Sequence, residues 1–364
     1  MSEAVESRGA AHLSAIAQAP RATGSTGEAT ARRYASAVLQ SAGYAVHDEP
    51  FAYSRFPGRW GTPLAGGLAT ITLTSTATLA LSGHAASSRW ALLLGMAAIA
   101  VFARAMLGDA VLDLPLLRSS GTNTVATRGA DAPAVWLVAH LDSKSQPVPS
   151  AVRVGAVVVL IAAFVGAAII GALTPSEGTA RTLWWMILLL TVVGALPLML
   201  STVGNRSPGA VDNASGVAAV LAAAEMMPPG LSIGVLLPSA EELGLAGARA
   251  WSRGRIPATA LNCDGVDDEG TVVIMYSGPL PVGLVGTIRV AATGAVELRR
   301  MPRGLMTDST ALSQRKWNTV TVSRGSLRTL ARVHRPSDSL ANLRGTGIDE
   351  VASLLARSAE ALAT

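Results

Sequence analysis

The chain has 364 residues, of which half are hydrophobic and only 15% are charged, and its formal net charge is +5. A soluble globular domain usually carries about 25% charged residues, so this composition predicts that part of the chain lies in a lipid bilayer. A basic balance suits nucleic acid or an anionic membrane surface. Since no basic run with interleaved aromatic residues is present, a nucleic-acid partner is excluded. The single cysteine, Cys263, excludes an intramolecular disulfide.

The segments of ordinary polarity predict alternating helices and strands. In chain order they are a helix over Glu28–Ala42, strands over Asn123–Thr127 and Ala134–Ala139, a helix over Ala214–Met226, a strand over Ile233–Leu237, a helix over Ala246–Ser252, strands over Ala258–Asn262 and Val272–Tyr276, and a closing amphipathic helix over Gly347–Leu362. This alternation predicts an α/β fold with a mixed, largely parallel sheet flanked by helices.

Four long apolar stretches interrupt this pattern, at Leu64–Gly83, Trp90–Leu107, Val154–Leu173 and Leu183–Val203. A helix of about 20 apolar residues crosses a bilayer, and each stretch is near that length. Short links join them in pairs, which predicts two transmembrane hairpins. The alternative is that they are buried helices of a large soluble core, an alternative that is strongest for the more polar first stretch.

The hairpins divide the chain into five parts. Residues 1–62, 109–145 and 208–364 are predicted to form one soluble domain, interrupted by hairpins over 63–108 and 146–207. The hairpin links carry Arg89 and Arg181, while the opposite side carries more basic residues: Arg55, Arg59, Arg118, Lys144, Arg153 and Arg206. Because positive residues favour the cytoplasmic side, we expect a multi-pass protein of the cell membrane with its soluble domain in the cytoplasm.

Two short segments carry the first candidate site residues. His140 follows a predicted strand, and Asp142 stands two residues further on, where a carboxylate can orient a metal-bound imidazole. Asp212, in the sequence Val-Asp-Asn-Ala-Ser-Gly, opens a predicted helix. Its carboxylate could bridge two cations or act only as a helix N-cap.

Three later segments add further acids and a second histidine. Glu241 and Glu242 follow the strand over 233–237, and two adjacent carboxylates repel each other unless a cation lies between them. One of them could bind the metal while the other takes a proton from water, or both could lie in an exposed acidic loop. Asp264 stands at another strand end. His334 supplies the second imidazole, with Asp338 placed to orient it or to cap the next helix.

Each of these residues has an ordinary structural explanation when it is taken alone. Together they supply two imidazoles and several carboxylates at loop or strand ends, and this mixture suits zinc with positions left for water and substrate. Cys263 alternates away from Asp264 along its strand and is expected to be a small core residue rather than a ligand.

The order of these motifs resembles that of the dizinc aminopeptidases of metallopeptidase family 28. The resemblance covers about residues 8–62, 121–145 and 206–362, and includes Pro20-Arg-Ala-Thr-Gly24 before a helix. It implies two zinc ions, a peptide substrate and the following roles. The metal ligands would be His140, Asp212 as the bridge, Glu242, Asp264 and His334; Glu241 would be the general base, Asp142 would orient His140, and Asp308 would support the site without binding metal.

The chain departs from the family between its first two motifs. Residues 143–208, which contain the second hairpin, replace a short loop, and Trp317-Asn318 stands where the family tends to have Gly-Ile-Pro. The sequence therefore leaves the activity undecided. A carboxypeptidase or a glutaminyl cyclase is possible on the same fold, as is a scaffold or binding protein without activity. A transporter is disfavoured because no charged residue lies in the middle of an apolar stretch. The oligomeric state is left open.

Overall fold

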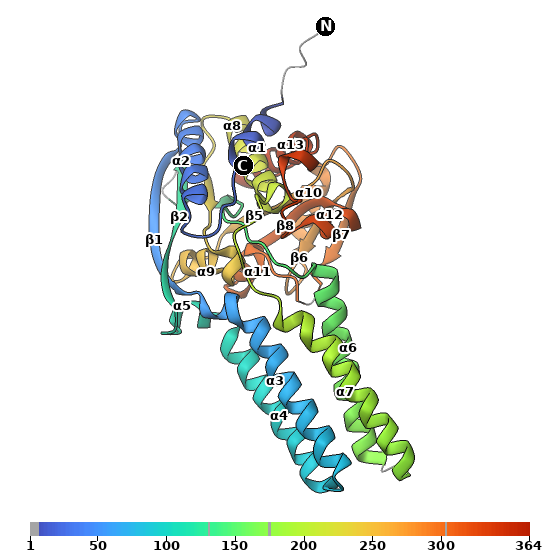
Figure 1. Ribbon diagram of the computed structural model, residues 1–364. Helices are drawn as coiled ribbons and strands as arrows, with labels where there is room; N and C mark the ends of the chain where they lie inside the picture. Colours follow the sequence, from blue (N-terminus) through green and yellow to red (C-terminus); the bar gives the residue numbers. More distant parts are fainter. Residues whose placement is uncertain (1–6, 130–131, 174–175, 303) are drawn as a thin grey trace. The chain divides into compact units, whose positions relative to one another are not determined.

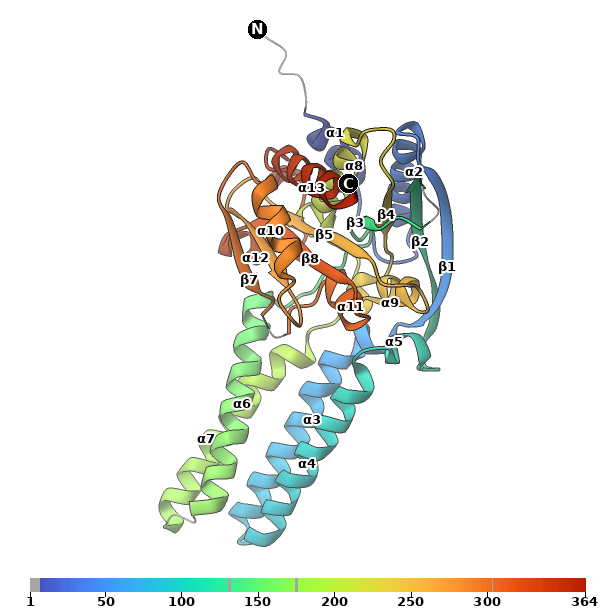
Figure 2. The same cartoon turned by 180° about the vertical axis from the view of Figure 1, so that it is seen from behind.

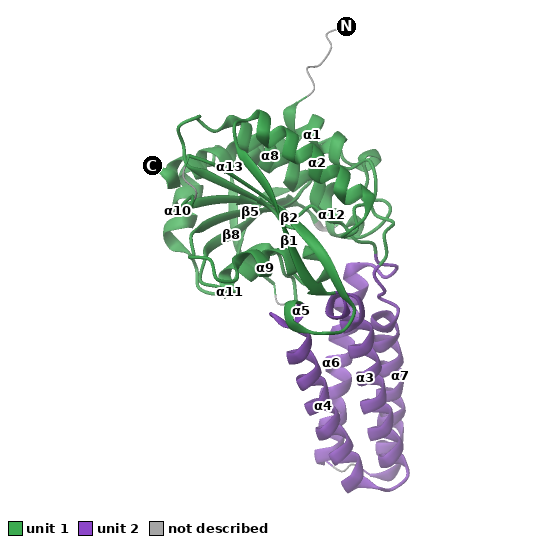
Figure 3. Cartoon of the chain, turned by 90° about the vertical axis from the view of Figure 1, so that its left-hand side faces the viewer, with its two compact units in different colours: residues 1–54, 112–145, 204–364 green, residues 55–111, 146–203 purple. Residues whose placement is uncertain are grey.

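The computed structural model describes residues 7–129, 132–173, 176–302 and 304–364. Within it the chain forms two compact units, each built from segments that are distant in sequence (Figure 3). The first unit comprises residues 1–54, 112–145 and 204–364, and the second comprises residues 55–111 and 146–203. The first unit is thus interrupted twice by segments of the second.

A mixed sheet of eight strands forms the centre of the first unit. The strands are β1 (Ala45–Ser54), β2 (Arg118–Arg128), β3 (Val135–Val138), β4 (Ile233–Leu237), β5 (Thr259–Val266), β6 (Thr271–Tyr276), β7 (Val296–Arg300) and β8 (Asn318–Gly325), in the spatial order β1-β2-β4-β3-β5-β8-β6-β7. The neighbouring strands β4, β3, β5 and β8 run parallel to one another, whereas β1 and β2 form an antiparallel pair. The predicted α/β class with a largely parallel sheet is confirmed.

Both faces of the central strands are buried, which is why their sequences read as continuous apolar runs. In β3, Leu137 contributes to one core together with residues of the helices α8 (Gly216–Met226) and α13 (Ile348–Ala363). Its neighbour Trp136 points to the other face, where it packs edge-on against Trp251 at a centroid distance of 4.7 Å. Alternate residues of one strand thus support two separate cores.

Helices cover the two faces of the sheet (Figures 1 and 2). The first face carries α1 (Arg8–Ile16), α2 (Thr26–Ser41), α8 (Gly216–Met226), α10 (Val282–Ala291) and α13 (Ile348–Ala363), and the second carries α9 (Ala246–Ser252) and α11 (Asp308–Gln314). The short helices α5 (Ala110–Asp113) and α12 (Leu327–Arg332) and the single turns η1 (Ala210–Ser215), η2 (Glu241–Leu243) and η3 (Leu340–Asn342) complete the chain.

Four long helices form the second unit: α3 (Phe56–Leu81), α4 (Ala85–Met106), α6 (Ser150–Leu173) and α7 (Glu177–Met199). All four are long and apolar enough to cross a membrane, by length and composition. The helix α3 begins at Phe56, earlier than the apolar stretch predicted from Leu64. Inside this unit, glycine allows close helix contact: a Cβ at Gly194 would lie 2.8 Å from Leu160 Cγ on α6. Many large apolar side chains nevertheless point outward: Leu93, Leu94, Val158, Ile161, Leu189 and Val192 are among them.

Candidate metal centre

The predicted site residues follow the carboxyl ends of neighbouring strands, where open α/β sheets usually bind ligands. His140 comes two residues after the end of β3, and Asp264 belongs to the last part of β5. Glu241 and Glu242 form the turn η2 after β4, and the preceding Ala240 has a left-handed backbone with φ 56°. Because these strands are adjacent in the sheet, residues far apart in the sequence come together at one edge.

Asp212 is brought to the same place by the turn η1. Gly209 begins this turn with φ 59°, and a Cβ on it would lie 2.2 Å from the carbonyl oxygen of Asp212, so only glycine fits. The carboxylate of Asp338 accepts hydrogen bonds from the backbone N–H of Val211 (2.7 Å) and of Asp212 (3.2 Å). Asp338 therefore holds the loop that carries Asp212, a role not anticipated from the sequence.

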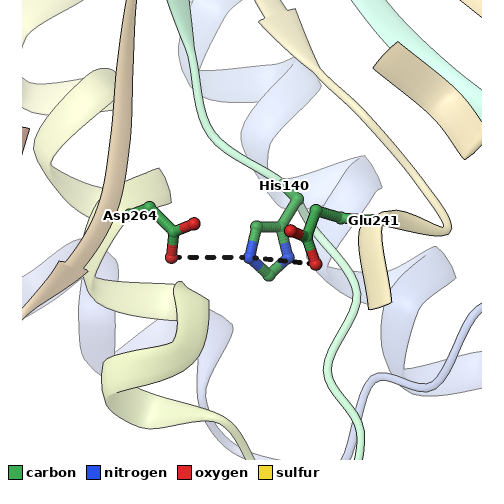
Figure 4. A group of neighbouring side chains, drawn as sticks. All are labelled: His140, Glu241 and Asp264. Atoms are coloured by element: carbon green, nitrogen blue, oxygen red, sulfur yellow. Dashed lines mark ion pairs between the residues drawn. The ribbon is translucent and has the colours of Figure 1, made fainter. Parts of the chain in front are cut away.

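His140 stands at the centre of the first group of potential ligands. Its Nε2 lies 3.3 Å from Asp212 Oδ1, 3.8 Å from Asp264 Oδ1 and 4.0 Å from Glu241 Oε2. Figure 4 shows the imidazole between the carboxylates of Asp264 and Glu241. Ligand atoms of His140, Glu241 and Asp264 lie within 4.8 Å of one another, close enough to hold a metal ion.

His334 forms a second group with Glu242 and Asp212. Its Nε2 lies 3.0 Å from Asp212 Oδ2 and 3.5 Å from Glu242 Oε1, and the three ligand atoms again fall within 4.8 Å of one another. Asp212 thus directs one carboxylate oxygen to each imidazole. This is the arrangement expected of a carboxylate that bridges two cations.

Asp142 supports the first group through the backbone. Its carboxylate accepts hydrogen bonds from the N–H groups of Glu241 (3.0 Å) and Glu242 (3.3 Å) and from Thr23 Oγ1 (2.9 Å). The Nδ1 atom of His140 lies 3.0 Å from the carbonyl oxygen of Asp142 and 3.6 Å from its carboxylate. Asp142 lies next to the imidazole, as predicted, but its carboxylate bonds mainly to the backbone N–H groups of Glu241 and Glu242.

The electrostatics of the protein alone favour a cation between these groups. Burial, and then the nearby carboxylates, raise the pKa of Glu241 well above its usual range. Burial opposes protonation of His140, yet Glu241 and Asp142 raise the pKa of its imidazole well above the ordinary value. The buried Glu242 Oε1 accepts no hydrogen bond from the described residues. Raised pKa values mean that these groups hold protons more strongly than usual. A divalent metal ion would supply the positive charge in place of the protons.

Asp308, the predicted supporting acid, is fully buried at the start of α11. Burial raises the pKa of its carboxyl group to about 7, with His140 opposing and Asp264 adding to the effect. Neither of its oxygens is hydrogen bonded within the described part of the chain. Asp308 is not one of the residues whose ligand atoms cluster within 4.8 Å, in agreement with a role outside the ligand set.

Two basic residues that the sequence analysis did not assign to the site lie against it. Lys144 Nζ is 2.6 Å from Glu242 Oε2. Burial alone would lower the pKa of Lys144, but Glu242 and Glu241 raise it above its ordinary value. Arg21 is fully buried and donates to the carbonyl oxygens of Leu141, Pro208 and Gly209. Arg21 was visible in the Pro20–Gly24 motif, whereas the spacing of Lys144 gave no such signal.

A further buried acid, Glu28, lies behind Asp142. It accepts hydrogen bonds from Gly24 N (2.6 Å) and from the hydroxyl of Ser239. Burial first, and then the charge of Asp142, raise the pKa of Glu28 to about 7. The sequence placed Glu28 only at the start of a helix.

Replacing Glu28 with glutamine is expected to flatten the pH dependence of stability. A carboxyl group whose folded pKa exceeds its unfolded value favours the folded state at low pH and loses that contribution as the pH rises from about 4.5 to about 7. The wild type should therefore lose up to about 3 kcal/mol relative to Glu28→Gln across this range. Thermal unfolding of both proteins between pH 4.5 and 8 measures the difference, and Glu360→Gln, at an exposed position, is the control. Parallel curves for wild type and Glu28→Gln would contradict the shift.

Comparison with known proteins agrees with this architecture. Residues 195–359 match the family model described as Peptidase family M28, a segment that contains Asp212, Glu241, Glu242, Asp264 and His334. His140 lies outside the matched segment. No curated protein sequence matches the chain.

Solved structures share the fold at low sequence identity. An aminopeptidase from Aneurinibacillus sp. strain AM-1 is 15% identical with a TM-score of 0.56, covering 98% of this chain and 93% of its own. BSAP, a zinc aminopeptidase from Bacillus subtilis, is 12% identical with a TM-score of 0.55 (96% and 93% covered). A glutaminyl cyclase from Fimbriiglobus ruber is 13% identical with a TM-score of 0.54 (98% and 96%). The fold is that of the zinc aminopeptidases and glutaminyl cyclases. These structures thus share the fold of the chain, and residues 195–359 are similar to Peptidase family M28.

Proposed function

We propose that the protein is a membrane-bound dizinc metallopeptidase that removes N-terminal residues from peptides. One observation carries this proposal: the two oxygens of Asp212 face two separate imidazoles, at 3.3 Å and 3.0 Å. Each imidazole also has carboxylate partners of its own: Glu241 and Asp264 lie with His140, and Glu242 lies with His334. A scaffold without activity would have no need of this many buried acids facing one another.

The ligand groups divide between two ions. His140 and Asp264 would hold the first zinc, Glu242 and His334 the second, and Asp212 would be shared by both. When bound, two zinc ions lower the pKa of water and polarise a scissile carbonyl group. The mixture of imidazole and carboxylate ligands suits zinc and leaves positions for substrate.

Glu241 is the group that moves the proton. It is nearly buried, and its Oε2 lies 4.0 Å from His140 Nε2, on the edge of the ligand group. Its carboxylate could take a proton from the attacking water and then give it to the leaving amine. The backbone bonds from Glu241 and Glu242 to Asp142 keep the two glutamates in place.

Cyclisation of N-terminal glutamine is the second candidate activity, because one of the matched structures is a glutaminyl cyclase. The discriminating experiment uses purified protein loaded with zinc. We expect hydrolysis of an aminoacyl-nitroanilide and no cyclisation of an N-terminal glutamine peptide. Cyclisation without hydrolysis would replace the aminopeptidase assignment, and release of C-terminal residues only would indicate a carboxypeptidase.

The four apolar helices of the second unit are proposed to span the cell membrane, with the first unit in the cytoplasm. Their outward aliphatic side chains would face lipid. We expect the protein to remain with membranes after an alkaline carbonate wash and to be cleaved by protease in inverted vesicles only. Release by the wash would contradict membrane insertion, and cleavage in right-side-out vesicles would reverse the orientation.

Replacing Asp212 with asparagine is expected to lower the metal content from two ions per chain to below one. Both ligand groups depend on this carboxylate, so its loss weakens both sites at once. Metal analysis after dialysis against a weak chelator measures the change. Asp48→Asn, which removes a half-exposed carboxylate from β1, is the control and should keep two ions. Full zinc content in Asp212→Asn would rule out the shared-ligand assignment.

A further inference from the structure

Lys144 stands next to the metal ligands in a position fixed by the backbone on both sides. The preceding Ser143 donates its N–H to Arg21 O (3.1 Å), and the following Ser145 exchanges two backbone hydrogen bonds with Gly204 (2.9 and 2.8 Å). With its neighbours held, Lys144 directs its ammonium to Glu242 Oε2 at 2.6 Å. The chain contains one other lysine, Lys316, which is exposed. The ammonium group of Lys144 is therefore held in place at the site.

The exposed fractions show on which side of the site Lys144 lies. The side chains of His140 and Glu242 are 1% and 4% exposed and form the floor. Those of Asp212 and His334 are 14% and 15% exposed, and that of Lys144 is 18%. Lys144 thus reaches solvent as much as Asp212 and His334, and its ammonium lies 2.6 Å from Glu242, so a substrate held at these ligands would pass close to it.

A positive charge at this place distinguishes between substrate groups. An ammonium carries three N–H donors, and one of them is directed to Glu242, which leaves others for an incoming acceptor. A substrate carboxylate would gain a charge-assisted hydrogen bond there, whereas a second ammonium would be repelled. A neutral group would gain less than a carboxylate but would not be repelled as an ammonium would.

We propose that Lys144 is a specificity-determining residue that binds a carboxylate of the substrate. This inference rests on the proposed peptidase function and narrows its substrate class to peptides with an anionic group next to the scissile bond. The carboxylate could belong to an acidic N-terminal side chain or to the C-terminus of a dipeptide, and both present the same chemistry to the ammonium. The alternative is that Lys144 only balances the charge of Glu242.

Three substrates separate these sources: Leu-Ala amide, Leu-Ala with a free carboxylate, and Glu-Ala amide. Zinc-loaded, full-length wild type in detergent micelles should cleave at least one of the two carboxylate substrates with a kcat/KM about 10- to 100-fold above that of Leu-Ala amide. The preferred substrate identifies the source. In Lys144→Met the preference should disappear through a higher KM, and Lys144→Arg should keep most of it. Lys316→Met removes a lysine charge elsewhere and should leave the preference unchanged.

A binding measurement keeps the test independent of turnover. In the Glu241→Gln background, calorimetry should show that at least one of the two carboxylate peptides binds about 10-fold or more tightly than Leu-Ala amide, and that adding Lys144→Met removes this difference. An equal loss of activity on all three substrates in Lys144→Met, or an unchanged ratio in the binding arm, would overturn the proposal. If wild type cleaved none of the peptides, the peptidase function would fail, and calorimetry would still decide the role of Lys144.

Discussion

Glu241→Gln is expected to lower kcat by about 10²- to 10⁴-fold while the protein keeps two zinc ions. Glutamine has nearly the same shape as glutamate but cannot take a proton from water. The ligands His140, Asp212 and Glu242 are untouched, and the backbone N–H of residue 241 can still bond to Asp142. The loss should therefore appear in kcat, with a much smaller change in KM.

Two measurements on the same samples decide this prediction. Metal analysis should give the same zinc content for Glu241→Gln and wild type, and hydrolysis of an aminoacyl-nitroanilide should differ by the factor above. Glu269→Gln makes the identical chemical change at an exposed position and should behave as wild type. Two zinc ions with unimpaired activity in Glu241→Gln would exclude Glu241 as the base and leave the proton transfer to another group.

Arg21→Met is expected to destabilise the first unit by about 3–5 kcal/mol. The guanidinium of Arg21 is completely buried, and it donates to Leu141 O (2.9 Å), to Gly209 O (2.9 Å) and to Pro208 O. Burial lowers its pKa to about 10, partly offset by Asp338, so it is still charged at neutral pH. Methionine fills much of the space but donates to none of the three carbonyl groups. Gly209 O still accepts from the backbone N–H of Ala214 (3.0 Å), whereas Leu141 O and Pro208 O lose the donor that Arg21 supplied.

Arg21 also connects the two segments of the first unit that precede and follow the second hairpin in the sequence. Leu141 precedes that insertion and Gly209 follows it, so the same side chain holds the His140 strand against the Asp212 turn. We therefore expect Arg21→Met to bind zinc more weakly than wild type. Urea unfolding followed by tryptophan fluorescence gives the stability, and zinc titration gives the affinity.

The control for Arg21→Met is Arg32→Met on α2. Arg32 is 19% exposed and makes one hydrogen bond to a carbonyl, that of Thr122, at 3.2 Å. Its loss should cost below about 1 kcal/mol because water can replace the missing donor. If the two variants lost the same stability, the carbonyls around Arg21 would not depend on its guanidinium.

The sequence was sufficient to predict the class of fold, because periodicity and strand-end residues are local properties. The strand over Ile233–Leu237 and the helix over Ala246–Ser252 have the predicted bounds. Other elements were missed: β1 is half exposed and contains Pro50, while β7 carries charges at three of its five positions. Neither has the apolar run that marks a buried strand, and both acquire their structure from pairing with a neighbour.

The candidate ligands were proposed from the sequence on their residue types and order. Glu242 follows a strand, Asp264 lies near the end of β5, and His334 follows the helix α12. Their number and order along the chain predict zinc chemistry, and that chemistry stays a prediction. Only the tertiary structure showed that Asp212 turns one oxygen to each histidine, that Asp338 holds the Asp212 loop, and that Arg21 and Lys144 lie against the site. These are contacts between residues up to 188 positions apart. They depend on the order of strands in the sheet and on side-chain direction, neither of which leaves a local pattern in the chain.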